Sequence, residues 1–222
     1  SLLLLNKNIR AQKPSPKSNR IVLPNGWGLS PAGRGYLLED LPLNIAVSNS
    51  GKLMAVTNNG ETTQSIQLID VKTGNIVDDI VIPESWLGLK FSADEKYLYA
   101  SGGNNNWILK YSIKNNKLLL LDMLILGDKW PNKISPAGID IDDQKNLLYV
   151  VTKENNSLYI LNLKTKKITG QYKLDGEAYT CLLSSDKKQL YISCWGCDKI
   201  YIFNTVSKSF TDEIGVGDNP ND

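Results

Sequence analysis

LGLKFSADEKYLYA, residues 87–100, contains the pattern that decides the fold. An apolar stretch leads into a polar turn, and a second stretch alternates Tyr with smaller side chains, as expected of two antiparallel strands. Three further segments follow the same pattern: LNIAVSNSGKLMAV (43–56), AGIDIDDQKNLLYV (137–150) and YTCLLSSDKKQLYI (179–192). The residues that open the turns, Ser48, Ser92, Asp142 and Ser184, lie 44, 50 and 42 residues apart. The chain therefore contains an internal repeat of about 45 residues.

A second hairpin follows each of these pairs of strands. The four hairpins are SIQLIDVKTGNIVDDIVI (65–82), NWILKYSIKNNKLLLLDMLIL (106–126), SLYILNLKTKKITGQYKL (157–174) and KIYIFNTVSKSFTDEIGV (199–216). Their turns are rich in Gly, Asn, Lys and Ser, which is typical of hairpin connections. Four strands in about 45 residues is the content of a β-propeller blade. We therefore expect an all-β fold with four four-stranded antiparallel blades, at about 41–83, 85–127, 133–175 and 176–218.

The N-terminal residues predict closing strands of the propeller. Residues 35–39 (GYLLE) have the character of an outermost strand, and residues 20–23 that of its partner, with Asn25-Gly26 as the turn. An outer strand without inner partners of its own is typical of propellers that close their ring between the two ends of the chain. The partial propeller is expected to span residues 20–222.

Residues 1–19 are interpreted as a signal-peptide remnant or a disordered leader. Leu2–Leu5 are too few to span a bilayer, which needs about 20 apolar residues. They fit a truncated apolar region of a secretory signal, with cleavage near Ala11-Gln12. An N-terminal strand is the alternative interpretation. The signal hypothesis places the protein in the periplasm, at the cell surface or outside the cell.

The charge balance and the lack of histidine exclude several function classes. The formal net charge is +2, so the chain has no basic excess with which to neutralise many phosphates of a nucleic acid. Because there is no His, Ser-His-Asp and Cys-His nucleophiles and His-ligated zinc are excluded. Asp140, Asp142 and Asp143 form a small acidic cluster, which we interpret as a solvated turn rather than a calcium site. No catalytic residue, metal ligand or cofactor is predicted.

The three cysteines are Cys181, Cys194 and Cys197. Cys194-Trp195-Gly196-Cys197 has the spacing of redox motifs, but those need the first Cys at a helix N-terminus. The flanking sequences, LYIS and DKIYIF, predict strands on both sides. A strand-to-strand turn with incidental thiols is therefore the preferred interpretation.

Long loops between the second and third strands, together with the loops between blades, should share one face of the propeller, which we term the loop face. Amides and flat aromatic rings gather there, a combination that suits sugars, peptides or other neutral polar ligands. The competing interpretation is that Asn forms turns and the aromatic rings pack adjacent blades. The candidate ligand-binding residues are Asn58, Asn59, Trp86, Asn105, Trp107, Trp130, Asn155, Tyr179 and Trp195. Trp130 and Trp195 are expected to contribute most, because they are large and lie in long loops.

Several stretches resemble YVTN-type β-propeller repeats. AVTN (55–58) and YVVT (149–152) match the repeat itself. The stretches LPNGWGLSPAGR (23–34), DLPLNIAVS (40–48), YASGGNNN (99–106), KISPAGI (133–139) and VGDNPND (216–222) are similar to exported bacterial proteins in which such a propeller precedes a phosphoesterase domain of the alkaline-phosphatase kind. Asn219 stands where that family usually has His, and the sequence contains none of the phosphoesterase metal ligands.

The resemblance implies a seven-bladed ring, which at about 45 residues a blade exceeds this chain. We therefore expect the remainder of the propeller to come from the same polypeptide or from a second chain. The leading hypothesis is a non-catalytic binding or scaffold module of an exported bacterial protein. The alternatives are the N-terminal part of a propeller–phosphoesterase enzyme and a lactonase-like propeller.

Overall fold

The computed structural model describes residues 21–29, 35–129 and 131–221. The predicted leader, residues 1–19, and Trp130 lie outside the described residues. The chain divides into two units, residues 1–37 and 38–222. None of the helices in the described ranges has the length and apolar character needed to cross a membrane.

The described part of the first unit contains one short hairpin. Strand β1 (Ile21–Val22) pairs with β2 (Gly28–Leu29), and Asn25-Gly26 lie in the turn, where Gly26 takes the left-handed backbone conformation that glycine tolerates best. The predicted pairing of residues 20–23 with residues 35–39 is wrong, because residues 35–39 form no strand. The single turn at Asn25-Gly26 brings β2 directly back to β1, so residues 21–22 pair with the nearby residues 28–29.

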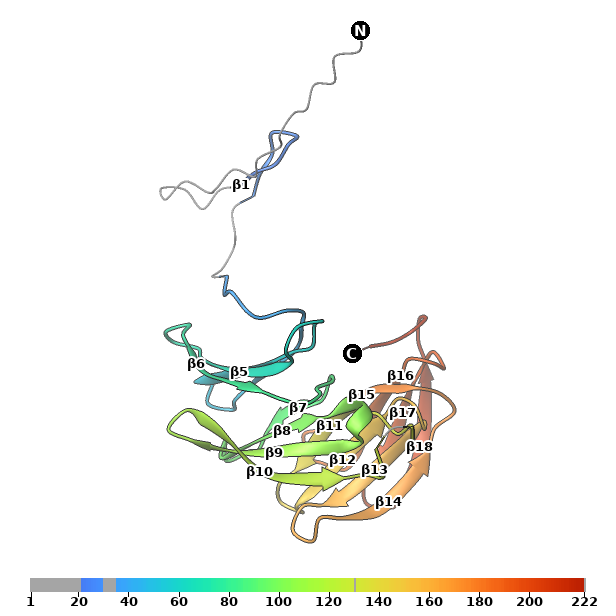
Figure 1. Cartoon of the computed structure of the whole chain (residues 1–222). Helices are drawn as coiled ribbons and strands as arrows, with labels where there is room; N and C mark the ends of the chain where they lie inside the picture. Colours follow the sequence, from blue (N-terminus) through green and yellow to red (C-terminus); the bar gives the residue numbers. More distant parts are fainter. Residues whose placement is uncertain (1–20, 30–34, 130, 222) are drawn as a thin grey trace. The chain divides into compact units, whose positions relative to one another are not determined.

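The second unit consists of four four-stranded antiparallel sheets in a β-propeller arrangement, which confirms the predicted fold class (Figure 1). The first sheet contains β3 (Pro42–Val47), β4 (Leu53–Asn58), β5 (Ser65–Asp70) and β6 (Ile76–Val81). The second contains β7 (Leu89–Phe91), β8 (Tyr97–Ser101), β9 (Trp107–Lys114) and β10 (Lys117–Ile125), with the short 3₁₀ helix η1 (Gly103–Asn105) before β9. The third contains β11 (Pro136–Asp142), β12 (Leu147–Thr152), β13 (Ser157–Asn162) and β14 (Lys167–Lys173). The fourth contains β15 (Ala178–Leu183), β16 (Gln189–Cys194), β17 (Lys199–Asn204) and β18 (Ser209–Gly215).

Three apolar clusters hold successive blades together, one between each neighbouring pair of sheets. Leu89 and Phe91 of β7 pack in the first cluster, and Ile139 and Ile141 of β11 in the next, so their predicted burial is confirmed. Since strand side chains alternate between faces, a central blade sends alternate residues into the clusters on its two sides. This two-sided burial explains why the strands of the repeat are nearly continuous in apolar residues.

The first strands of the blades line a common cavity of about 450 Å³. Along it β3 contacts β7, β7 contacts β11, and β11 contacts β15; between β15 and β3 the described residues form no contact of similar extent. At Gly138 a Cβ atom would stand 2.5 Å from the Cα atom of Thr180, so glycine is what lets β11 and β15 approach so closely.

Asp140 and Asp142 are each only 1% exposed, so the interpretation of the acidic cluster as a solvated turn is wrong for these two residues. One carboxylate oxygen of Asp140 accepts a hydrogen bond from the Leu183 N–H at 2.7 Å, and the other lies 2.9 Å from the Lys90 ammonium. Asp140 therefore joins the inner strands β7, β11 and β15. Asp143, which is exposed, accepts a hydrogen bond from the Ala93 N–H at 2.9 Å and so links two blades.

We expect Asp140→Ala to lower the free energy of unfolding by about 3 kcal/mol, because it removes the shared acceptor of a buried network and leaves the Leu183 N–H without a partner. Chemical denaturation measures this change. Asp186→Ala is the control, since Asp186 forms its ion pair with Lys188 at the surface and should matter far less. Equal effects of the two substitutions would contradict the role assigned to Asp140.

Candidate functional site

A cavity of about 340 Å³ opens among loops of the first three blades, on the predicted loop face. Its walls come from the β4–β5, β6–β7, β8–β9, β10–β11 and β12–β13 connections. The residues that line it are Asn59, Gln64, Glu84, Ser85, Trp86, Gly103, Asn104, Ser135, Lys153 and Glu154. We call this space the loop cavity. Its size is in the range of small-ligand pockets in proteins.

Trp86 provides the aromatic wall of the loop cavity. Its backbone N–H donates to the Ser101 carbonyl at 3.0 Å, which fixes the β6–β7 connection against the end of β8. The indole Nε1 is buried and has no hydrogen-bond partner among the described residues. The ammonium of Lys153 lies 5.8 Å from the centre of a Trp86 ring, within the range of cation–π attraction.

Side-chain amides supply the polar wall. Oε1 of Gln64 accepts a hydrogen bond from the Ser85 N–H at 2.7 Å, and Oδ1 of Asn104 accepts one from the Ser135 hydroxyl at 3.1 Å. Each of these bonds uses the amide oxygen, so the NH₂ groups of both side chains remain available as donors. Asn59 completes this wall, and its backbone N–H is bonded to the Leu41 carbonyl at 3.0 Å.

Two of the predicted binding residues, Asn59 and Trp86, line the loop cavity. Others hold the blades: buried Asn58 donates to the Ser65 hydroxyl and to Gln67, and Asn155 donates to the Tyr159 hydroxyl at 2.7 Å. Trp107 is buried beneath the ammonium of Lys129, which lies 5.0 Å from its ring. The remaining described ones, half-buried Asn105 and Tyr179 and exposed Trp195, lie elsewhere in η1, β15 and the β16–β17 loop.

Asparagines that end the second-to-third-strand loops have a conformational role. Asn106 and Asn156 both adopt the left-handed backbone conformation, which Asn tolerates better than most residues. In each case the backbone carbonyl accepts a hydrogen bond from the end of the blade's outer strand, Leu126 or Leu174. Part of the Asn enrichment on the loop face therefore serves the turns, as the competing interpretation held.

Sequence reasoning did not identify the charged residues of the loop cavity, Glu84, Lys153 and Glu154. All three stand in connections between strands, where charged residues are common, so composition alone could not single them out. Only the meeting of the β6–β7 and β12–β13 connections places them around one space. Within the described ranges, no group of three or more His, Cys, Asp or Glu could hold a metal ion.

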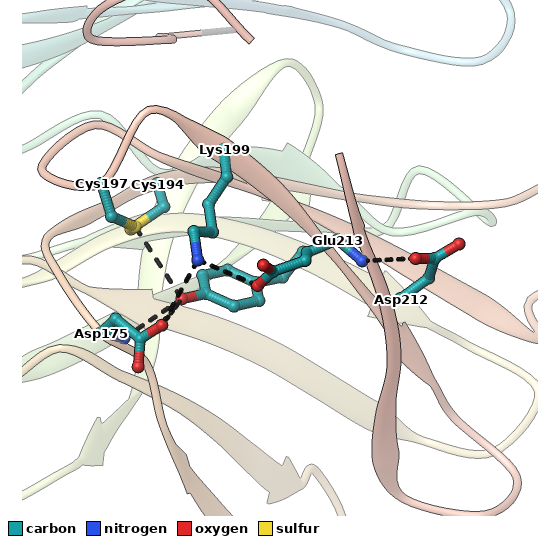
Figure 2. Close-up of polar contacts among 7 residues, drawn as sticks. Asp175, Cys194, Cys197, Lys199, Asp212 and Glu213 are labelled. Carbon is teal, nitrogen blue, oxygen red and sulfur yellow. Dashed lines mark hydrogen bonds and ion pairs between the residues drawn. A yellow bond between two sulfur atoms is a disulfide. The ribbon is translucent and has the colours of Figure 1, made fainter. Parts of the chain in front are cut away.

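Cys194 and Cys197 form a disulfide, so their interpretation as incidental thiols is wrong (Figure 2). They do flank a strand-to-strand connection, as predicted, because Cys194 ends β16 and Cys197 precedes β17. Cys181 is a free thiol, and its burial raises its pKa, which makes it a poor nucleophile.

The disulfide adjoins a polar network around Tyr201 (Figure 2). Sγ of Cys197 lies 3.9 Å from the Tyr201 hydroxyl, which donates to Oδ2 of Asp175 at 2.7 Å. The Lys199 ammonium lies 3.5 Å from the same carboxylate oxygen and 2.9 Å from Oε2 of Glu213. The Tyr201 hydrogen bond, aided by Lys199, lowers the pKa of Asp175. The network fastens the β14–β15 connection to the fourth blade.

Comparisons with known proteins show similarity of fold. No protein-family model matches the chain, and no curated protein matches it. A functionally unknown protein from Desulfotomaculum acetoxidans DSM 771 is similar in structure with a TM-score of 0.65 and 15% identity, over 81% of this chain and 59% of that one. Hydrazine synthase from Kuenenia stuttgartiensis is similar with a TM-score of 0.62 and 17% identity, over 81% of this chain and 51% of the other. The chain thus spans between half and three fifths of the length of these two structures.

We expect Cys197→Ser to lower the free energy of unfolding by no more than about 2 kcal/mol, because a disulfide across so short a loop restricts the unfolded chain only slightly. Urea denaturation measures the loss, and the wild-type protein in reducing buffer should match the variant. A loss twice as large would show that the disulfide holds the fourth blade together.

Proposed function

We propose that this chain is a non-catalytic β-propeller binding module of an exported bacterial protein, and that the loop cavity is its ligand site. The observation that carries the proposal is the meeting of Trp86 with Asn59, Gln64 and Asn104 in one cavity built by loops of successive blades. An indole face packs the apolar side of a ligand while amide groups bond its polar edge. A polar ligand such as a sugar or a short peptide has this combination of surfaces.

The disulfide supports the exported location. Disulfides form and persist in oxidising compartments and are rare in the cytosol of mesophiles, where thiols are kept reduced. Cys194 and Cys197 form the disulfide, and the third cysteine, Cys181, is a buried free thiol. The resemblance to YVTN-type propellers of exported bacterial proteins, in stretches such as residues 23–34 and 216–222, points the same way.

We expect Trp86→Ala to weaken ligand binding at least about tenfold, because aromatic anchors in cavities contribute most to small-ligand and interface affinity. A panel of oligosaccharides and short peptides, screened by tryptophan fluorescence and measured by calorimetry, identifies the ligand to be used. Trp195→Ala is the matched control, since Trp195 does not line the loop cavity. Equal losses for both variants, or unchanged binding by Trp86→Ala, would place the ligand elsewhere.

The fourth blade points to a partner of the same fold. One face of this sheet packs against the third blade through residues such as Cys181, Leu190 and Phe203. The opposite face presents Leu182, which is 58% exposed, and half-buried Tyr191 and Ile202, which are cross-strand neighbours. The second and third blades, by contrast, pack against a neighbouring sheet on both sides. We infer that this face packs against a further propeller blade, from the same polypeptide or from a second chain.

If that inference holds, the 222-residue chain should self-associate at micromolar concentration, because the uncovered apolar face favours contact with any similar surface. Replacing both Leu182 and Ile202 by Asp should shift sedimentation toward the monomer without unfolding the protein. A chain that is monomeric at every concentration, with or without the substitutions, would count against a missing blade.

A further inference from the structure

The charged side chains of the loop cavity are two carboxylates and one ammonium. Glu84 comes from the β6–β7 connection, and Lys153 and Glu154 come from the β12–β13 connection. The formal charge of the lining is therefore −1, although the whole chain carries +2. The difference in sign means that the cavity does not simply reflect the average surface of the protein.

These three charges also differ in whether they have partners. The Lys153 ammonium is placed against the Trp86 ring at 5.8 Å. Among the described residues, neither Glu84 nor Glu154 takes part in an ion pair or a side-chain hydrogen bond. Glu84 nevertheless is only half exposed, and its carboxylate reaches toward Gly103 on the opposite wall. Among the described residues, the charged groups left without a partner in this cavity are thus negative.

The opposite face carries the turns between the first and second strands of each blade, and we call it the turn face. Carboxylates there form hydrogen bonds between blades. Glu95 accepts a hydrogen bond from the Ser50 hydroxyl at 2.9 Å, and Asp143 accepts one from the Ala93 N–H at 2.9 Å. Both acids thereby join neighbouring blades, which is a structural use of their charge. Glu84 and Glu154 have no such use, although they too stand where the loops of different blades meet.

We propose that the loop cavity selects ligands that carry a protonated primary amine, with Glu84 and Glu154 as its acceptors and the Trp86 ring beside it. This inference rests on the proposed function, because it names the chemistry of the ligand for the same site. A primary ammonium donates three hydrogen bonds, and bonds from an ammonium to a carboxylate are stronger than neutral ones. The indole ring, over which the Lys153 ammonium lies at 5.8 Å, packs against the apolar part of the same ligand.

Such an amine has two sources, an amino sugar and a lysine side chain of a peptide. Acetylation of the nitrogen removes the charge in both cases and leaves the rest of the ligand in place. Two matched pairs therefore test the proposal: a glucosamine trisaccharide against its N-acetylated form, and a short peptide with a central lysine against the same peptide with acetyl-lysine. The pair that binds identifies the source.

Calorimetric titration of the full 222-residue chain measures all four ligands. In at least one pair the amine should bind about tenfold more tightly than its acetylated form at low ionic strength, and added salt should reduce this ratio. Glu84→Gln and Glu154→Gln should each lower the ratio several-fold while circular dichroism stays unchanged. Glu177→Gln is the matched control, because Glu177 is a half-buried carboxylate of the β14–β15 connection that does not line the cavity.

The outcomes separate the inference from the function on which it rests. If the acetylated ligands bind as well as the amines, and Trp86→Ala weakens them, the site is real and selection for a cation is wrong. If the amine preference persists in both Gln variants, the carboxylates named here do not cause it, which also overturns the inference. If none of the four ligands binds, both the inference and the proposed ligand class fail.

Discussion

Face-to-face packing of successive four-stranded sheets is the interaction on which the rest of this structure depends. An isolated blade would leave both faces of its central strands in water, so no blade of this chain is stable alone. Three apolar clusters, one at each junction, remove those faces from water. Because the packing fixes how one blade follows the next, it also fixes which loops become neighbours at either end of the sheets.

Polar groups consequently have different roles at the two ends of the blades. On the turn face, Glu95 and Asp143 bond to the backbone or side chains of the adjacent blade and stabilise the junction. At the core, Asp140 joins three inner strands through one carboxylate. On the loop face, some amides, such as that of Asn58, are used in hydrogen bonds within the fold. Asn59, Asn104 and Glu84 instead line the loop cavity. That contrast within one repeat is why the loop cavity is the best candidate for a binding site.

The fourth blade differs from the second and third, because it packs against a neighbouring blade on one side only. Its inner face shares a cluster with the third blade, and aromatic contacts such as Tyr172 with Phe203, at 4.8 Å between ring centres, close that junction. Its other face keeps Leu182 exposed and Tyr191 half-buried. The disulfide links the two ends of the β16–β17 connection, and the Tyr201 network joins the β14–β15 connection to this blade.

The sequence by itself determined the repeat, the four blades and the burial of residues such as Leu89 and Ile141, because strand alternation and turn chemistry are local properties that the residues carry with them. It also located the loop face, on which Asn59 and Trp86 were found together.

Only the tertiary structure decided which polar residues support the fold and which surround a cavity. The sequence placed Asp140 in a solvated turn, whereas in the structure it contacts β7 and β15. Lys153 and Glu154 are loop residues that surround a cavity only because the β12–β13 connection lies beside the β6–β7 connection. The pairing of Cys194 with Cys197 and the absence of a strand over residues 35–39 were likewise found only in the structure. Whether a polar group is buried, paired or free depends on neighbours that lie 40 or more residues away along the chain, and no local pattern records them.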